Sequence, residues 1–250
     1  MKRLLVKLYL LIRPLLMFFS KIETYLSRKW VQSAYHRMFM LQWQFSFGQE
    51  LGYFDHTMDL FYQFPVRSEA GWLERGVLNR IALMSHENPI AMELCCGDGF
   101  NAMHFYSPCC KSLLCVDNDN SVLKIARKKN CASNIEYLLR DIMKEMPSRE
   151  GGFHNIICDA ALAYFNEKEI VEIIKKVKKR LKKEGIFSGM VGVEYHEGGY
   201  VFEGVEDLKR LLKPYFKNVW VYETVSTIKH SLYFEASDEE LPFYNAKGIT

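Results

Sequence analysis

The stretch Ile90-Ala91-Met92-Glu93-Leu94-Cys95-Cys96-Gly97-Asp98-Gly99-Phe100-Asn101-Ala102 decides the fold of this chain. A short apolar run ends in the carboxylate Glu93, and a tight turn with two glycines leads into a helix-like segment. Glycine tolerates positive φ, and because it lacks a Cβ it lets a ligand lie close to the backbone. The free N–H groups of a helix N-terminus follow the turn. The pattern is typical of a parallel strand that passes into a helix at a nucleotide-binding loop.

On the C-terminal side of this loop, short β-like runs alternate with helical segments, which predicts a parallel sheet. Strands are expected near 89–94, 112–116, 135–139, 154–158, 186–191, 217–223 and 230–236. The last two are joined only by 224–229, short enough for a hairpin, and a hairpin joins antiparallel strands. The sequence therefore predicts an α/β fold with a Rossmann-like, seven-stranded, mostly parallel sheet and an antiparallel last strand. A helix is expected at 167–183, with Gly185 ending it.

The composition indicates a globular protein in a reducing compartment. The chain has 250 residues, 49% hydrophobic and 25% charged, with a net charge of +3. This charge is too small to indicate nucleic-acid binding by itself. The seven cysteines include no C-x-x-C pair, so we expect neither a disulfide framework nor a zinc site. A cytoplasmic location without a bound metal follows from this cysteine usage.

Residues 1–30 are both apolar and basic, with seven Lys and Arg against Glu23 alone. Their longest uncharged run, 14–20, is too short to span a bilayer, which needs about 20 apolar residues. As a helix, this segment has a wide apolar arc with basic flanks, which suits a helix lying peripherally at the inner face of an anionic membrane. A helix packed on the protein's own core, or on another subunit, is the alternative.

The chain divides into four expected segments. These are a basic amphipathic helix at 1–30, an aromatic-rich helical cap or substrate region at 31–88, a nucleotide-binding domain at 89–237 and a tail at 238–250. A helix capped at Ser68 is expected to run to Met84, with its apolar positions Leu73, Val77, Ile81 and Met84 at helical spacing.

Three carboxylates follow the ends of the first three expected strands: Glu93, Asp117 and Asp141. Ligands of open parallel sheets bind at the carboxyl ends of the strands, so we expect these side chains to line one cleft. Asp117 follows Gly97 by about 20 residues, a spacing that suits a carboxylate accepting from both hydroxyls of a ribose.

With these residues the chain resembles the class I S-adenosylmethionine-dependent methyltransferases. The resemblance covers about residues 67–237 and includes the terminal hairpin. The first motif of that family runs acid-x-Gly-x-Gly-x-Gly. Gly97 and Gly99 match it, whereas Cys95 stands where the family has its first glycine, beside the methionine portion of the cofactor. More loosely, 54–56, 62–65, 72–77 and 230–234 resemble a bacterial subgroup of small-molecule or lipid-glycan type.

The resemblance implies S-adenosyl-L-methionine as the cofactor and assigns residues to its parts. Glu93 would hold its amino group, directly or through water, and Asp117 would bind the ribose. Asn118 would flank the adenine, Asp141 would accept from the adenine amino group, and the Ile142 amide would face the ring.

Two other functions remain open at the level of sequence. The run 97–102 also satisfies the dinucleotide fingerprint G-x-G-x-x-A, which is typical of NAD-dependent oxidoreductases. Glu93, Asp141 and the final hairpin favour a methyltransferase instead. The third function is a non-catalytic, membrane-associated module that binds the cofactor.

Candidates for removing a proton from the acceptor follow the fourth and fifth strands. They are Asp159, Tyr164 and His196, of which His196 has the most suitable ordinary pKa. Asp159 is also expected to touch the cofactor, and a purely structural role is its alternative. The expected reaction is O- or N-methylation of a small-molecule, glycan or lipid-linked acceptor. Nucleic acid is not expected as a partner, because no Pro-Pro-Tyr-type motif and no basic accessory domain are present.

Overall fold

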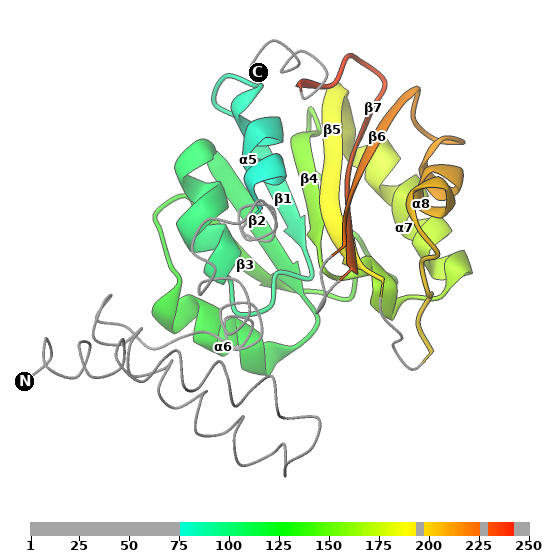
Figure 1. Ribbon diagram of the computed structural model, residues 1–250. Helices are drawn as coiled ribbons and strands as arrows, with labels where there is room; N and C mark the ends of the chain where they lie inside the picture. The colour runs from blue at the N-terminus through cyan, green and yellow to red at the C-terminus, as the bar shows by residue number, and fades with distance from the viewer. Residues whose placement is uncertain (1–75, 194–197, 226–229, 243–250) are drawn as a thin grey trace, which may run out of the picture. The chain divides into compact units, whose positions relative to one another are not determined.

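The computed structural model describes residues 76–193, 198–225 and 230–242, which form a seven-stranded sheet with helices on both faces (Figure 1). Tertiary contacts divide the chain into units 1–65 and 66–250, and the described residues all belong to the second. The expected helix at 1–30, most of the region 31–88 and the helix start at Ser68 lie outside the described residues. Within the described ranges, no helix is both long and apolar enough to cross a membrane.

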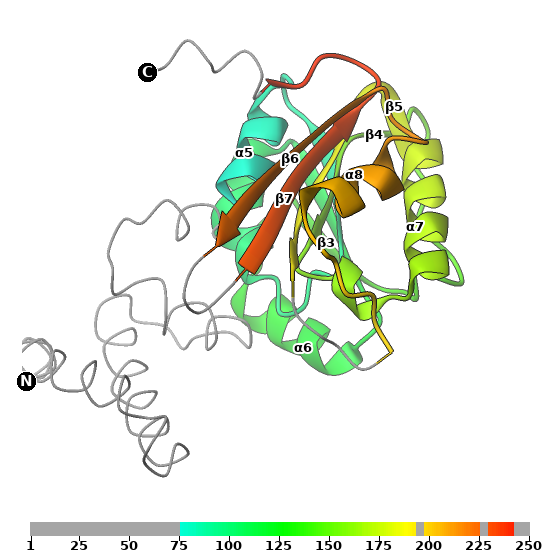
Figure 2. The ribbon, with the colours of Figure 1, turned by 45° about the vertical axis from the view of Figure 1, so that its right-hand side comes forward.

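The sheet has the predicted number and direction of strands. They are β1 (Ile90–Leu94), β2 (Ser112–Asp117), β3 (Ile135–Leu139), β4 (Phe153–Asp159), β5 (Leu181–Gly192), β6 (Asn218–Val225) and β7 (His230–Ser237). Their order is β3-β2-β1-β4-β5-β7-β6. β7 runs antiparallel to both β5 and β6, which lie on either side of it (Figure 2), and the other neighbours are parallel. The expected single reversed strand is confirmed.

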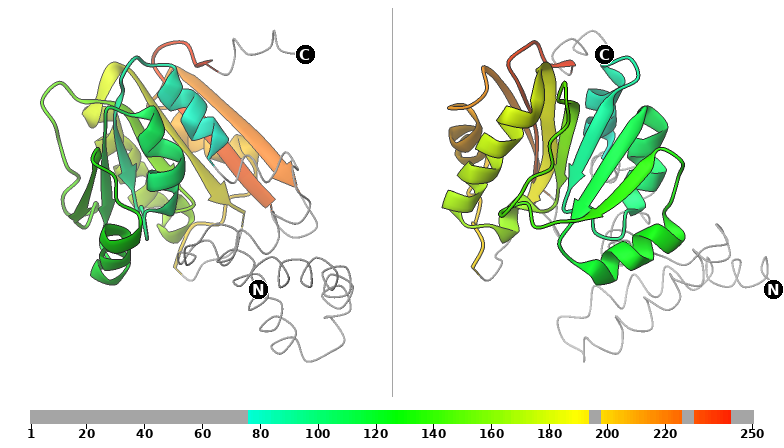
Figure 3. Two further views of the ribbon diagram at one scale, coloured as in Figure 1. Left: turned by 90° about the vertical axis from the view of Figure 1, so that its left-hand side faces the viewer. Right: turned by 180° about the vertical axis from the view of Figure 1, so that it is seen from behind.

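Helices cover the two faces of the sheet in separate groups (Figure 3). The α-helices are α5 (Val77–Met84), α6 (Asn120–Lys129), α7 (Glu167–Arg180) and α8 (Val205–Leu212). A π-helical turn, η1 (Ala102–Tyr106), and the 3₁₀ turns η2 (Ser107–Cys109) and η3 (Leu162–Tyr164) complete the set. α5, η1 and α6 pack on one face, and α7 and α8 pack on the other.

The predicted helix 68–84 is wrong at Gly76, whose left-handed φ of 66° directly precedes Val77, the first residue of α5. The buried side of α5 also differs from the predicted one. Leu78, Ala82 and Leu83 are at most 3% exposed and pack on the sheet. Met84, which we expected on the apolar side, is 68% exposed. The spacing of apolar residues alone did not show which side faces the sheet, because apolar residues occur all round this short helix.

α7 begins where its capping residues indicate. The Asn166 side chain accepts from the Glu169 backbone N–H at 3.1 Å, and the Glu169 carboxylate accepts from the Asn166 N–H at 2.9 Å. This reciprocal capping box satisfies two N–H groups that the helix itself leaves unpaired. The apolar side of the helix, made of Ile170, Ile173, Ile174 and Val177, is buried against the sheet.

α7 ends earlier than predicted. Its last residue is Arg180, and β5 begins at Leu181, which pairs with Phe153 of β4. The expected helix to residue 183 and the terminating role of Gly185 were therefore wrong, because Gly185 lies inside β5. The Arg180 guanidinium fixes this helix end by donating to the carbonyl of Met146 at 2.9 Å.

Candidate functional site

The loop after β1 has the backbone of a glycine turn, although its first residue is a cysteine. Gly97 and Gly99 have φ of 57° and 74°, and Cys95 has φ of 56°. In this left-handed region a Cβ crowds the following carbonyl, at a cost of about 1–2 kcal/mol. Cys95 thus has a left-handed conformation that glycine would adopt without this cost.

Backbone hydrogen bonds attach this loop to the end of β2. The Gly97 N–H donates to Asp117 Oδ2 at 2.9 Å, and the Cys96 N–H donates to the Val116 carbonyl at 3.1 Å. A Cβ built on Gly99 would lie 2.1 Å from the Tyr137 hydroxyl, so this close approach requires glycine. The glycine turn and the Asp117 carboxylate therefore lie next to each other at the carboxyl end of the sheet.

Glu93 is a buried carboxylate among other carboxylates. It is 3% exposed, and the Cys115 thiol donates to its Oε2 at 3.7 Å. Burial raises the pKa of Glu93 well above its usual range, and the nearby charge of Asp159 raises it further, followed by those of Asp98 and Asp117. A cation placed among these groups would favour the ionised form of Glu93.

The predicted adenine-side residues lie at the ends of β2 and β3. Asn118 is exposed directly after β2, and Asp141 is half-buried two residues after β3. The Asp141 carboxylate accepts from the Met143 N–H at 2.9 Å, and this bond, together with Lys144, lowers the pKa of Asp141. Ile142 is buried, and its carbonyl accepts from Lys176 at 3.2 Å. The two strand ends are thus neighbours, as the sequence predicts.

Asp159, the last residue of β4, belongs to a hydrogen-bonded network that the sequence did not reveal. Its Oδ2 accepts from the Tyr106 hydroxyl at 2.7 Å and from Asn101 Nδ2 at 3.2 Å. Asn79 Nδ2 of α5 donates to the Tyr106 hydroxyl at 3.1 Å. Burial, and then the charge of Asp159, raises the pKa of Tyr106 well above its usual range, so its hydroxyl remains a donor. Ala160, which follows, has a left-handed φ of 57°.

No sequence spacing links Asn79, Asn101 and Tyr106 to Asp159, since they come from other elements of the fold. The one signal is Asn79 itself, a polar residue between the buried Leu78 and Ala82 on a short apolar helix.

The other two base candidates are Tyr164 and His196. Tyr164 ends η3 after β4 and is 60% exposed. His196 lies outside the described residues. In the part of the chain that the structure describes, no group of His, Cys, Asp and Glu is arranged to hold a metal ion.

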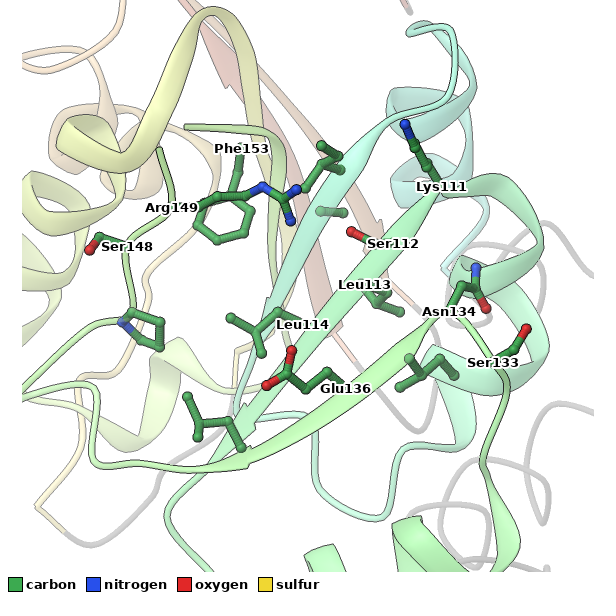
Figure 4. Close-up of a pocket in the computed structure, with 15 residues that line it drawn as sticks. Lys111, Ser112, Leu113, Leu114, Ser133, Asn134, Glu136, Ser148, Arg149 and Phe153 are labelled. Atoms are coloured by element: carbon green, nitrogen blue, oxygen red, sulfur yellow. The ribbon is translucent and has the colours of Figure 1, made fainter. Parts of the chain in front are cut away.

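A cavity of about 560 Å³ lies at the opposite end of the strands from the carboxylates (Figure 4). Its floor includes Ile90, Ser112 and Ile135, the first residues of β1, β2 and β3, and Arg149 lies at its side. The connection 140–152 between β3 and β4 contains no helix, so among the described residues no helix of this connection covers this half of the sheet face. The cavity is therefore separate from the candidate site.

Comparison with known proteins agrees with this geometry. Residues 91–185 match the family model described as a methyltransferase domain. No curated protein matches the sequence. The N-methyltransferase NodS from Bradyrhizobium japonicum WM9, in complex with S-adenosyl-L-homocysteine, has a similar fold, with a TM-score of 0.56 at 18% identity over 73% of this chain and 93% of that one.

Two further solved structures have similar folds. The DhpI–SAH complex gives a TM-score of 0.56 at 15% identity, over 83% of this chain and 96% of that one. A structure described as a putative S-adenosylmethionine-dependent methyltransferase from Listeria monocytogenes gives 0.52 at 15% identity, over 68% of this chain and 98% of that one. At these identities the likeness shows the fold alone.

Proposed function

We propose that the protein, whose residues 91–185 are a methyltransferase domain of the class I S-adenosylmethionine-dependent type, methylates a small-molecule, glycan or lipid-linked acceptor at oxygen or nitrogen. When bound, the cofactor supplies an electrophilic methyl group on a sulfonium. The chain then has to bind the cofactor, align the acceptor with that methyl group and accept a proton where the acceptor is a hydroxyl.

The observation that carries this proposal is the gathering of carboxylates at the end of β1, β2 and β4. S-adenosylmethionine has two cationic groups, the sulfonium and the ammonium, and the charges around Glu93 suit cations. A nicotinamide dinucleotide has an anionic pyrophosphate instead, which Asp159, and Glu93 when it is ionised, would repel. The electrostatics thus favour the methyltransferase over the NAD-dependent oxidoreductase.

The order of the strands supports a proposed assignment of the cofactor's parts to residues. β3, β2, β1 and β4 are consecutive neighbours. Asp141 after β3 suits the adenine, and Asp117 of β2 suits the ribose, because each carboxylate oxygen keeps a second lone pair beside its backbone bond. The methionine portion then lies near β1 and β4, where Glu93 and Asp159 suit its ammonium group.

For the chemical step we propose that His196 is the base where the acceptor needs one, with Tyr164 beside the acceptor. The side-chain pKa of histidine and the place of both residues after the carboxyl ends of β4 and β5 support this assignment. We also propose that residues 1–30 hold the protein at the inner face of an anionic membrane, which is supported by their basic and apolar sequence.

Isothermal titration with S-adenosylmethionine and with NAD tests the cofactor. We expect binding of the first only, and Asp117→Asn should weaken it at least about 10-fold, since a carboxylate acceptor for the ribose is lost. The matched control is Glu136→Gln, a carboxylate at the opposite end of the strands, which should leave binding unchanged. Binding of NAD with similar affinity would contradict the proposal.

The acceptor is identified with methyl-labelled cofactor and an extract of the native host, separated into lipid, glycan, small-molecule, protein and nucleic-acid fractions. We expect label in one of the first three fractions. Label confined to protein or nucleic acid would overturn the acceptor class, and binding without any turnover would indicate the non-catalytic module.

A further inference from the structure

A relay of hydrogen bonds connects α5 to the end of β4 through the interior. Asn79 is 3% exposed and Tyr106 is fully buried. The Tyr106 hydroxyl accepts from Asn79 at 3.1 Å and donates to Asp159 Oδ2 at 2.7 Å. Asn101 Nδ2 donates to the same oxygen at 3.2 Å. Two donors on one oxygen fix the plane of the Asp159 carboxylate and favour its ionised form.

The backbone around Tyr106 is built to bring this hydroxyl to β4. Tyr106 is the last residue of the π-helical turn η1, where the Ser107 N–H donates to the Ala102 carbonyl across five residues. π-Helical turns are rare and occur frequently at functional sites. Gly76, with φ of 66°, precedes α5, and a Cβ there would lie 2.5 Å from the Tyr106 hydroxyl. Both η1 and the residue before α5 thus depart from ordinary α-helix geometry, and both departures lie next to Tyr106.

We propose that Tyr106, oriented by Asn79, is a positioning residue that holds the Asp159 carboxylate for the ammonium group of the cofactor. The inference rests on the proposed function. Asp159 lies on the β4 side of β1, whereas Asp117 lies on the β2 side, so Asp159 serves the methionine portion and not the nucleoside. Removing the phenol oxygen should therefore weaken binding only of ligands that have an amino-acid portion.

The experiment compares three ligands by isothermal titration to Tyr106→Phe and to the wild-type chain. S-adenosylmethionine and S-adenosylhomocysteine carry the ammonium group, and 5′-methylthioadenosine lacks the whole amino-acid portion. We expect the affinity for the first two to fall about 10-fold, the usual effect of losing one hydrogen bond to a charged group, while the third is unchanged.

Tyr200→Phe is the matched control. Tyr200 also donates to a carboxylate, that of Asp207 on α8, at 2.8 Å. The side chains of this pair bond to no residue that we propose to hold the cofactor, so all three affinities should stay as in the wild type. A second variant, Asn79→Ser, keeps the phenol but removes its donor, and it should shift the same two affinities in the same direction by a smaller factor.

The possible outcomes separate this inference from the proposed function. Equal weakening of all three ligands would show that Tyr106 only supports the fold, and unchanged affinities would show that it does not act on Asp159. Either result overturns the inference while S-adenosylmethionine still binds the wild-type chain. If the wild-type chain bound none of the three ligands, the proposed function itself would fail. Should Tyr106→Phe not fold, the Asn79→Ser result decides.

Discussion

Cys95 and Ala160 are left-handed residues that directly follow β1 and β4, so each comes shortly after a carboxylate, Glu93 or Asp159. Non-glycine residues in this region store strain, and such strain tends to occur at binding sites, where the surrounding structure imposes the conformation. In this protein the two strained positions fix how two strand ends present their acidic side chains.

Cys95→Gly should relieve the strain at the first of these positions. We expect the free energy of unfolding to rise by about 0.5–1 kcal/mol, the strain relief being partly offset by the greater freedom of glycine in the unfolded chain. Cofactor affinity should be equal or higher. Urea unfolding and titration measure the two effects. The control is Cys158→Gly in the buried strand β4, which should destabilise the protein. If Cys95→Gly also destabilised the protein, the packing of the Cys95 thiol would contribute more to stability than the backbone strain costs.

Glu235 on β7 is a fully buried carboxyl group that has no hydrogen-bond partner among the described residues. Burial raises its pKa to about 8. In the unfolded chain the group ionises near its ordinary value of about 4.5. Between these two values the unfolded chain has already lost a proton that the folded protein keeps, so stability is greatest below the lower value and falls as the pH rises towards the higher one.

Glu235→Gln should remove this dependence. We expect the wild-type free energy of unfolding to fall by up to about 4 kcal/mol more than that of the variant between pH 4.5 and pH 8. Parallel urea titrations across this range measure the difference. The pKa of Glu93 is also raised, but Glu93 is present in both proteins, so its contribution to the pH dependence of stability is the same in each and cancels in the difference. Identical pH slopes would mean that Glu235 is ionised in the folded protein.

At the scale of single residues, the sequence predicted groups that follow strand ends and missed groups that act from within helices. Asp117 and Asp141 were found because strand ends can be recognised from the apolar run before them. Tyr106 was not found, because its place depends on a π-helical turn and on contact with α5. Neither feature leaves a regular spacing in the sequence.

At the scale of elements, the strands were predictable because short apolar runs are separated by polar turns. The end of α7 was not, since Leu181-Lys182-Lys183-Glu184 has good intrinsic helix propensity. Pairing of Leu181 with Phe153 overrides this local preference. The extra residue per turn in η1 is likewise a result of tertiary packing.

At the scale of the whole molecule, the basic segment 1–30 should direct binding to membranes. The full chain should sediment with anionic phosphatidylglycerol vesicles and not with neutral phosphatidylcholine vesicles. Replacing Lys2, Arg3, Lys7 and Arg13 by Gln should weaken this binding more than about 10-fold, since each basic residue near the surface contributes about 1 kcal/mol. The control replaces Lys175 and Lys179, two exposed lysines of α7, and should have no effect. Unchanged sedimentation of the first variant would contradict the membrane role.

The place of β7 between β5 and β6 has a consequence for how the protein is made. During translation β6 leaves the ribosome before β7, yet in the finished sheet β6 pairs only with β7. The nascent chain can join the first five strands while β6 still has no neighbour, and its apolar Val219 and Val221 then stay accessible to chaperones. Completion of the sheet is therefore a late event in synthesis, because β6 can join the sheet only through β7, the last of the seven strands to be made.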